Sequence, residues 1–305
     1  MIYRGYSTDT GLRLRMLMTG SLLFLLYSAF ALFMMVIGAD VIFMFIICGA
    51  LLTAQFFMSE KLVLISMKAR VVTEDEMPAL HSSIATIAQM AGIPKPRVAY
   101  SDSNVPNAFA TGRSPKKATI CVTKGIMEVL SDRELDAVLG HEVAHIKNRD
   151  VAMMTLASFF STLIGMAIQW MSFAALFGGM ARGRQGGQHF AVLMVVMLVS
   201  VLVYFLSQIL VMSLSRYREF AADESGAMIV GAPSTLATAL LKISGQIEDL
   251  SDNELRHVEG ASAFFFVPAF HSGSLMRLFS SHPPVHKRVE RLSRMQENGY
   301  LWTSV

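Results

Sequence analysis

Residues 131–148 read SDRELDAVLGHEVAHIKN, and this stretch decides how the rest of the chain is interpreted. Ser131 followed three residues later by Glu134 forms a capping-box pattern, which predicts that a helix begins here. His141 and His145 stand four residues apart, so their imidazoles project from one face of that helix, about one turn apart. Two side chains placed in this way can reach a single metal ion.

The pattern H-E-x-x-H at residues 141–145 predicts a catalytic zinc site. Both imidazoles can reach one Zn²⁺ at about 2.0–2.1 Å. Glu142 lies one step round the helix, where its carboxylate faces the water that zinc activates and can accept that water's proton. A chance match on a surface helix is the alternative, but only roughly 0.01 such matches are expected in a chain of this composition. We therefore expect one Zn²⁺ per chain, bound by His141 and His145, with Glu142 as the general base.

The composition is that of a membrane protein. Hydrophobic residues make up 53% of the chain and charged residues 16%, whereas about 25% of residues are charged in ordinary soluble domains. Four apolar runs, 16–37, 41–58, 151–177 and 190–212, are each long enough to cross a bilayer as a helix of about 20 residues. The predicted fold is mainly α and polytopic. The net charge of +3 comes without a Lys/Arg-dense tract, so we expect the lipid bilayer and no nucleic acid as a partner.

Lys and Arg are unevenly divided between the two sides of the predicted membrane. Only Arg182 and Arg184 lie near the span ends on one side, while the other side carries Arg4, Arg13, Arg15, Lys61, Lys68, Arg70, Lys147, Arg149, Arg216 and Arg218. Cytosolic loops are enriched in Lys and Arg. We therefore expect a protein of the cytoplasmic membrane with both termini in the cytosol. The predicted division is a transmembrane hairpin at 16–58, a first catalytic part at 59–150, a second hairpin at 151–212 and a second catalytic part at 213–305.

The water-soluble parts read as a mixture of helices and short strands. Pro78 and Gly92 bracket a run with helical spacing of apolar residues. Short β-like runs near 97–100, 108–111 and 119–122 are separated by turn residues. We expect a last amphipathic helix near 285–295. The soluble domain is therefore predicted to be α+β with a small sheet.

A catalytic zinc site needs a third protein ligand. Asn148 and Val151 stand where the extended H-E-x-x-H-x-x-G-x-x-H motif has Gly and His, so the ligand must come from beyond residue 212, from among Glu219, Asp223, Glu224, His257, His271 and His282. Two membrane crossings return Glu219 to the side of His145, and both lie about 10 Å from the bilayer edge at 1.5 Å per helical residue. Glu219 is favoured on these grounds, and a surface ion pair with Arg216 is the alternative.

Three ordered motifs resemble one known family. They are HEVAH at 141–145, SRYREFAAD at 215–223 and SHPP at 281–284 followed by Arg288, with PNAFATG at 106–112 as a fourth segment. Together they are similar to the HtpX-type membrane zinc metalloproteases, relatives of the Ste24-type CAAX prenyl proteases. The resemblance covers nearly the whole chain, and Phe220, where family members often have Tyr, is its one visible departure.

The resemblance implies both a fold and an activity. It implies Glu219 as the third zinc ligand and a zincin-like, cytosol-facing catalytic domain with a small β-sheet. The expected activity is that of an endopeptidase that cleaves misfolded or damaged membrane proteins, in quality control and the stress response. Prenylated peptides are a less favoured substrate, because four spans cannot enclose the large chamber of the prenyl proteases.

Three further residues are candidates for supporting roles. Asp223 lies one helical turn after Glu219 and can hold a ligand histidine through its other ring N–H; a solvated helix Asp is the alternative. His282 and Arg288 can donate to the tetrahedral oxyanion. Alternatively, His282 caps the last helix and Arg288 pairs with Asp223 or Glu290.

The segment Asn107, Ala108, Phe109 and Ala110 is a candidate substrate-binding strand. An extended peptide paired to an exposed sheet edge gains backbone hydrogen bonds with little sequence selectivity. That mode suits unfolded and membrane-protein substrates of many sequences.

Two other classes of function compete with proteolysis. A non-catalytic zinc-binding membrane chaperone or scaffold would have no need of Glu142. A cation transporter would need ionisable residues facing one another within the spans, and the four apolar runs contain almost none.

Overall fold

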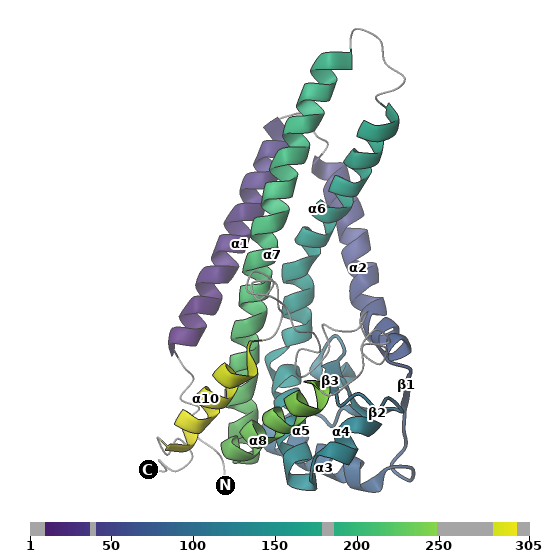
Figure 1. Cartoon of the computed structure of the whole chain (residues 1–305). Coiled ribbons are helices and arrows are strands. Elements are labelled where there is room, and N and C mark those ends of the chain that lie inside the picture. The colour runs from purple at the N-terminus through teal and green to yellow at the C-terminus, as the bar shows by residue number, and fades with distance from the viewer. Residues whose placement is uncertain (1–9, 37–40, 179–185, 249–282, 298–305) are drawn as a thin grey trace. The chain divides into compact units, whose positions relative to one another are not determined.

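The computed structural model describes residues 10–36, 41–178, 186–248 and 283–297 (Figure 1). The chain forms two compact units. One comprises Met1–Ala54 and Met154–Leu214, and the other comprises Gln55–Met153 and Ser215–Val305. Each unit is therefore built from two separate stretches of chain.

The first unit is helical and apolar. Its residues come from α1 (Thr10–Val36), α2 (Val41–Ser66), α6 (Asp150–Gly178) and α7 (Gly186–Val230). In the described part of the chain, three helical segments are long and apolar enough to cross a membrane: Thr10–Val36, Asp150–Gln169 and Ala191–Val230. These agree with three of the four predicted spans. The fourth predicted span, 41–58, is helical within α2, and its crossing of the membrane stays a prediction.

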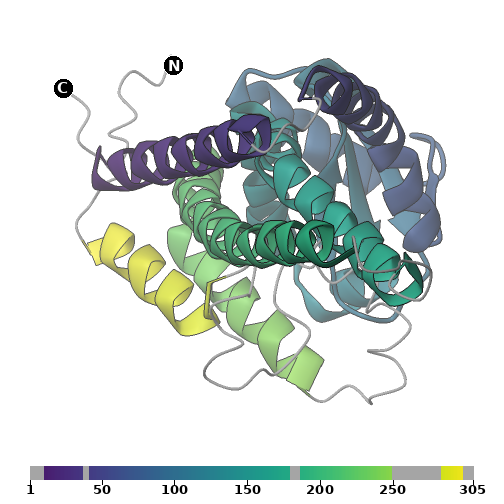
Figure 2. The same cartoon turned by 90° about the horizontal axis from the view of Figure 1, so that it is seen from above.

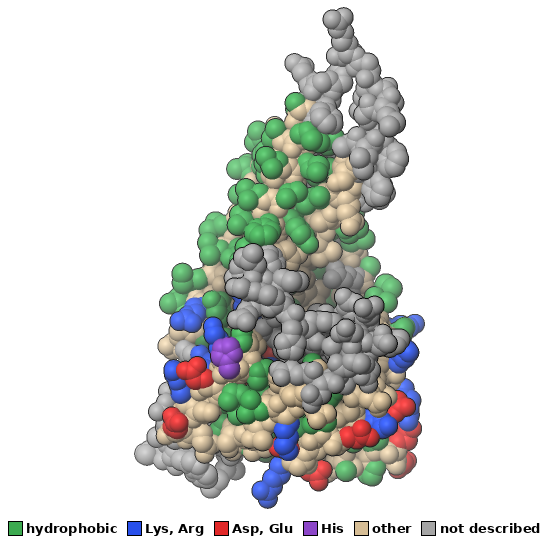
Figure 3. Space-filling view, in the orientation of Figure 1, with side chains coloured by type: hydrophobic (Ala, Val, Ile, Leu, Met, Phe, Trp, Pro, Cys, Tyr) green, Lys and Arg blue, Asp and Glu red, His purple; other side chains and the backbone are tan. Residues whose placement is uncertain are grey.

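Large apolar side chains of this unit point outward. Phe24 and Leu198 are each 71% exposed, and Figure 3 shows hydrophobic side chains covering the surface of these helices. A soluble protein would bury such side chains, whereas lipid tails accommodate them. The surface of the unit is therefore suited to a bilayer interior.

Inside the first unit, the helices contact one another through a small apolar cluster and a polar bond. Leu23 of α1 packs against Val211 and Leu214 of α7. The Gln208 side-chain amide donates to the hydroxyl of Ser161 at 2.9 Å. Hydrogen bonds between helices of this kind hold membrane bundles together.

The second unit contains a four-stranded sheet in the order β1-β2-β4-β3. Its strands are β1 (Ala69–Val71), β2 (Arg97–Ser101), β3 (Ala108–Thr111) and β4 (Thr119–Thr123). The two central strands, β2 and β4, are parallel, and the outer strands pair antiparallel to them. The sequence predicted the last three strands. It did not predict β1, which has three residues, two of them exposed.

Helices pack around this sheet and supply most of the core. They are α3 (Pro78–Ala91), α4 (Lys124–Val129), α5 (Asp132–Asn148), α8 (Pro233–Glu248) and α10 (Val285–Glu297), with a short 3₁₀ turn, η1, at Pro115–Lys117. Figure 2 shows α8 and α10 side by side. The core joins fully buried side chains from the sheet and from these helices, including Ile84, Ile120, Leu139, Leu240 and Leu292.

Local sequence explains where the central helices begin and end. Pro78 opens α3, and Gly92 ends it in the left-handed conformation at φ 71°, which glycine adopts without strain. At the start of α5, the backbone N–H of Ser131 donates to the Glu134 carboxylate at 2.9 Å, so the predicted capping box is formed.

Candidate metal centre

Helix α5 places the H-E-x-x-H side chains in the interior of the second unit. His141 is 1% exposed and Glu142 is 4% exposed. The Nε2 atoms of His141 and His145 lie 2.9 Å apart. The spacing of four residues therefore brings both ring nitrogens to one point, as the sequence predicted.

Helix α7 brings a carboxylate to the same point. Glu219 Oε1 lies 3.4 Å from His145 Nε2, and its Oε2 lies 3.8 Å from His141 Nε2. Ligands bound at about 2.0–2.1 Å to a tetrahedral zinc stand about 3.3 Å from one another. The Glu219 carboxylate therefore approaches both ring nitrogens, and one donor atom from each of the three side chains lies within 4.8 Å of the other two. Among the residues that the structure describes, these three side chains form the group able to hold a metal ion.

Two glycines let α5 and α7 approach closely enough for this arrangement. A Cβ added to Gly226 would lie 2.7 Å from His141 Cα, and one added to Gly140 would lie 2.5 Å from Val230 Cγ2. Such distances are far below the 3.5–4.0 Å or so of ordinary carbon contacts. The crossing of these helices at Gly140 and Gly226 therefore sets how near Glu219 comes to the histidines.

A buried ion pair lies behind His141. Asp223 Oδ1 is 3.0 Å from His141 Nδ1. Arg288 of α10 donates to both oxygens of Asp223, at 2.6 and 2.8 Å, and is fully buried. Of the two pairings considered for Arg288, the structure shows the one with Asp223, whereas Glu290 pairs with Arg294.

The predicted roles of Arg288 and His282 as donors to the oxyanion stay predictions. Arg288 Nη1 also lies 3.6 Å from Glu219 Oε2, so its guanidinium faces the metal-binding group, and its role as an oxyanion donor stays a prediction. His282 lies outside the described residues, as do the alternative ligands His257 and His271.

Burial and neighbouring charges set the protonation of these groups. Burial, helped by the charge of His145, lowers the pKa of His141 to about 4. Burial also acts to lower the pKa of His145, but Glu219 and Glu142 outweigh it and raise that pKa above its usual value. Burial raises the pKa of the Glu142 carboxyl to about 7. At neutral pH His141 is therefore in the neutral form that binds a metal, and Glu142 is poised between its two protonation states.

The predicted substrate strand lies beside Glu142. Strand β3 is an edge of the sheet within the described residues, and its backbone at Ala110 donates a hydrogen bond to Glu142, which opposes only part of the rise in pKa that burial causes. The side chains of Asn107, Ala108 and Phe109 are buried. The backbone of Ala110 therefore reaches the Glu142 carboxylate beside the candidate metal site.

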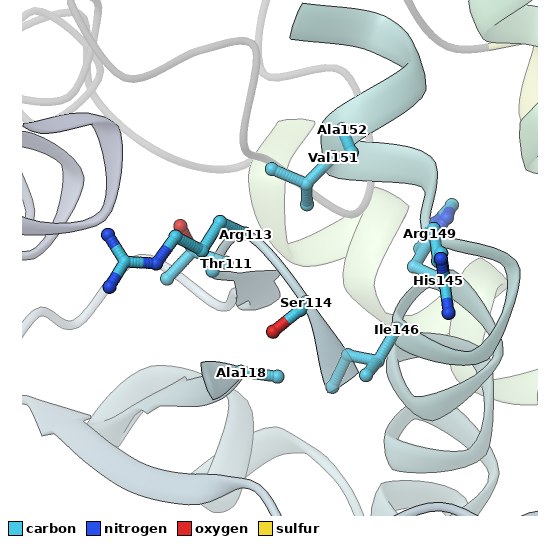
Figure 4. Close-up of a pocket in the computed structure, with 10 residues that line it drawn as sticks. Thr111, Arg113, Ser114, Ala118, His145, Ile146, Arg149, Val151 and Ala152 are labelled. Carbon is cyan, nitrogen blue, oxygen red and sulfur yellow. The ribbon is translucent and has the colours of Figure 1, made fainter. Parts of the chain in front are cut away.

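A small pocket has His145 in its wall (Figure 4). It is lined by the end of β3, the last turn of α5 and the first turn of α6, including Thr111, Ile146, Val151 and Ala152. Arg113 points away from it in Figure 4 and stacks over the ring of Phe57, 4.5 Å from its centroid.

Sequence reasoning missed two residues that contact the site. Asp150 Oδ2 lies 2.7 Å from His145 Nδ1, and Asp150 is paired with Arg218. A spacing of five residues from His145 gave no signal, because the contact depends on the left-handed backbone at Arg149, between the end of α5 and the start of α6.

A family model, "Peptidase family M48", matches residues 74–296. The match spans all three metal-binding residues and most of the chain. The chain belongs to peptidase family M48. M48 members are metallopeptidases, so the family agrees with a metal at His141, His145 and Glu219.

Similar M48 proteins extend over the full chain. "Protease HtpX homolog 2" of Methanosarcina acetivorans is 46% identical over 296 residues, which is 96% of this chain and 98% of that protein. "Protease HtpX homolog" of Moorella thermoacetica is 41% identical, covering 96% and 97%. The crystal structure of S. mikatae Ste24p has a TM-score of 0.54 at 20% identity, and the match covers 88% of this chain and 62% of that one.

These likenesses confirm the predicted family and fold. The chain is a membrane metalloprotease of the M48 family, mostly helical, with a small mixed sheet. The likeness to Ste24p shows a shared fold and no more.

Proposed function

We propose that this M48 peptidase is a zinc endopeptidase of the cytoplasmic membrane, which hydrolyses peptide bonds of misfolded or damaged membrane proteins. The observation that carries the proposal is the buried carboxylate of Glu142 beside three convergent ligand atoms of His141, His145 and Glu219. A site that only bound zinc would not need the buried carboxylate of Glu142 beside the three ligands.

Each of these residues has its own proposed role in hydrolysis. His141, His145 and Glu219 would hold the zinc, which when bound supplies a Lewis acid for the peptide carbonyl and lowers the pKa of water. Glu142 accepts the proton of the attacking water and passes it to the leaving amine. Burial raises the pKa of this carboxyl in the metal-free site, so Glu142 holds a proton more readily than an exposed glutamate does. Asp223 orients His141 through Nδ1, and Arg288 and His282 are proposed to stabilise the oxyanion.

The substrate is proposed to lie extended along β3. Strand β3 is an edge of the described sheet, where an extended backbone can add as a further strand, and Asn107, Ala108 and Phe109 are themselves buried. Recognition would then depend on an unfolded backbone and little on sequence. An unfolded stretch of a membrane protein, lying near the lipid, meets this requirement.

The orientation in the membrane is part of the proposal. The excess of Lys and Arg on one side of the spans favours termini and a catalytic unit in the cytosol. Stress-response quality control at that face of the membrane is the proposed physiological role.

The activity is tested by Glu142→Gln in detergent-purified, zinc-loaded protein. We expect zinc content to be unchanged and cleavage of an unfolded substrate such as casein to fall by about 10²–10⁴-fold, because the general base is lost. Glu128→Gln is the matched control, since Glu128 is 61% exposed on α4, and it should keep both properties.

Retained cleavage in Glu142→Gln would reject Glu142 as the base. A parent protein that binds zinc and cleaves nothing would instead favour the non-catalytic scaffold.

A further inference from the structure

The second histidine of the motif is held by a carboxylate from outside the motif. His145 Nδ1 lies 2.7 Å from Asp150 Oδ2, and Asp150 is 5% exposed. Between them, Arg149 ends α5 in the left-handed conformation, at φ 57° and ψ 39°. Asp150 follows as the first residue of α6, and its carboxylate contacts the ring of His145.

A buried arginine completes the contact. Arg218 of α7 pairs with Asp150 and donates to the carbonyl oxygen of Asn148 at 3.1 Å. Arg218 is 7% exposed. A buried carboxylate without a cation would be costly, and Arg218 supplies that cation. Arg218 directly precedes Glu219 on α7. Of these adjacent residues, Arg218 therefore pairs with Asp150, which contacts His145, and Glu219 lies at the candidate metal site.

The two histidines are supported in the same way. His141 Nδ1 faces Asp223, which Arg288 holds, and His145 Nδ1 faces Asp150, which Arg218 holds. A carboxylate at Nδ1 keeps the proton there and leaves the lone pair of Nε2 for the metal. The two Nε2 atoms accordingly face each other at 2.9 Å.

We propose that Asp150 and Arg218 are positioning residues, which fix the tautomer and the orientation of His145 for metal binding. The inference rests on the proposed zinc enzyme. It differs from the roles of Glu142 and Glu219, because neither Asp150 nor Arg218 touches the metal or the substrate. A simple ion pair that joins α6 to α7 is the competing account.

The test measures zinc affinity of the full-length, detergent-purified protein by competition with a chromophoric chelator. The variant Asp150→Asn keeps the shape of the side chain, but its amide can donate to Nδ1 and so favour the wrong tautomer. We expect zinc affinity to fall by about 10–100-fold. Asp132→Asn, an exposed position on α5, is the control and should leave affinity unchanged.

A second variant keeps the inference testable if Asp150→Asn does not fold. Arg218→Gln leaves Asp150 in place without its cation and should also weaken zinc binding, whereas Arg218→Lys should recover part of the loss. The Co²⁺-loaded parent and variants should differ in their d–d absorption bands, because the geometry of His145 changes.

Unchanged zinc affinity and an unchanged Co²⁺ spectrum, with only a lower melting temperature of the metal-free protein, would overturn the proposal in favour of a simple ion pair. Making the same variants in a Glu142→Gln background separates this result from catalysis, since affinity is read without turnover. Cleavage is measured separately, in variants that retain Glu142, and bears on the proposed function and not on Asp150.

Discussion

Arg288 is a fully buried charged residue whose guanidinium donates to both oxygens of Asp223. Asp223 in turn contacts His141. Arg288 therefore links α10, the last helix that the structure describes, to the candidate metal site. Removing one partner of a buried ion pair leaves the other charge without compensation, which is costly.

Replacing Arg288 by Met should destabilise the protein by about 3–5 kcal/mol, because the Asp223 carboxylate stays buried beside His141. Thermal unfolding of the metal-free protein in detergent measures the effect. Arg294→Met is the matched control on the same helix, and since Arg294 is 69% exposed in its pair with Glu290, we expect no measurable change. Equal effects of the two substitutions would contradict the importance of burial for this pair.

The two histidines and Glu142 could be predicted from sequence because helical geometry alone places residues one turn apart together. The place of Glu219 relative to the predicted spans favoured it as the third ligand, and the family resemblance implied it. Asp150 and Arg218 could not, because their contact with His145 depends on the left-handed turn at Arg149. Positive φ at an arginine is uncommon and leaves no mark in the sequence.

Among the helices and strands, the crossing of α5 and α7 determines the geometry of the candidate metal site. Gly226 of α7 faces the backbone of His141 so closely that a Cβ would lie 2.7 Å from both its Cα and its N. Both atoms are backbone and cannot rotate aside. The separation of the two helices, and with it the reach of Glu219, is therefore fixed by the absence of a side chain at this position.

Gly226→Ala should weaken zinc binding measurably, because the helices must part by a sizeable fraction of an ångström and carry Glu219 away from the histidines. The zinc dissociation constant from chelator competition is the readout. Gly245→Ala on α8 is the control, since a Cβ there meets nothing within 4 Å, and it should stabilise its helix slightly. If Gly226→Ala binds zinc as the parent does, the close crossing does not set the site.

Helices α3, α5 and α10 and three of the four strands could be predicted, because capping residues and apolar spacing are local signals. Strand β1 could not, since its three residues are held by pairing with β2 and not by a pattern of their own. The order of the strands, with β4 between β2 and β3, is likewise set by tertiary packing. That order leaves β3 at the edge beside Glu142.

At the scale of the whole molecule, two distant parts of one chain build the metal centre. His141 and His145 precede the predicted second hairpin, and Glu219 follows it. Composition alone indicated a membrane protein, because apolar residues are too many for one soluble core. Which apolar side chains stay exposed among the described residues, such as Phe24 and Leu198 at 71% exposure, follows only from the packing of the helices.

The central claim is that His141, His145 and Glu219 hold one zinc ion together. It is tested most directly by elemental analysis of Glu219→Ala after dialysis, beside the parent and the neighbouring Glu224→Ala variant. We expect about one zinc per chain in the parent and in Glu224→Ala, and a large loss in Glu219→Ala, because a catalytic zinc needs three protein ligands. A full complement of zinc in Glu219→Ala would contradict the account.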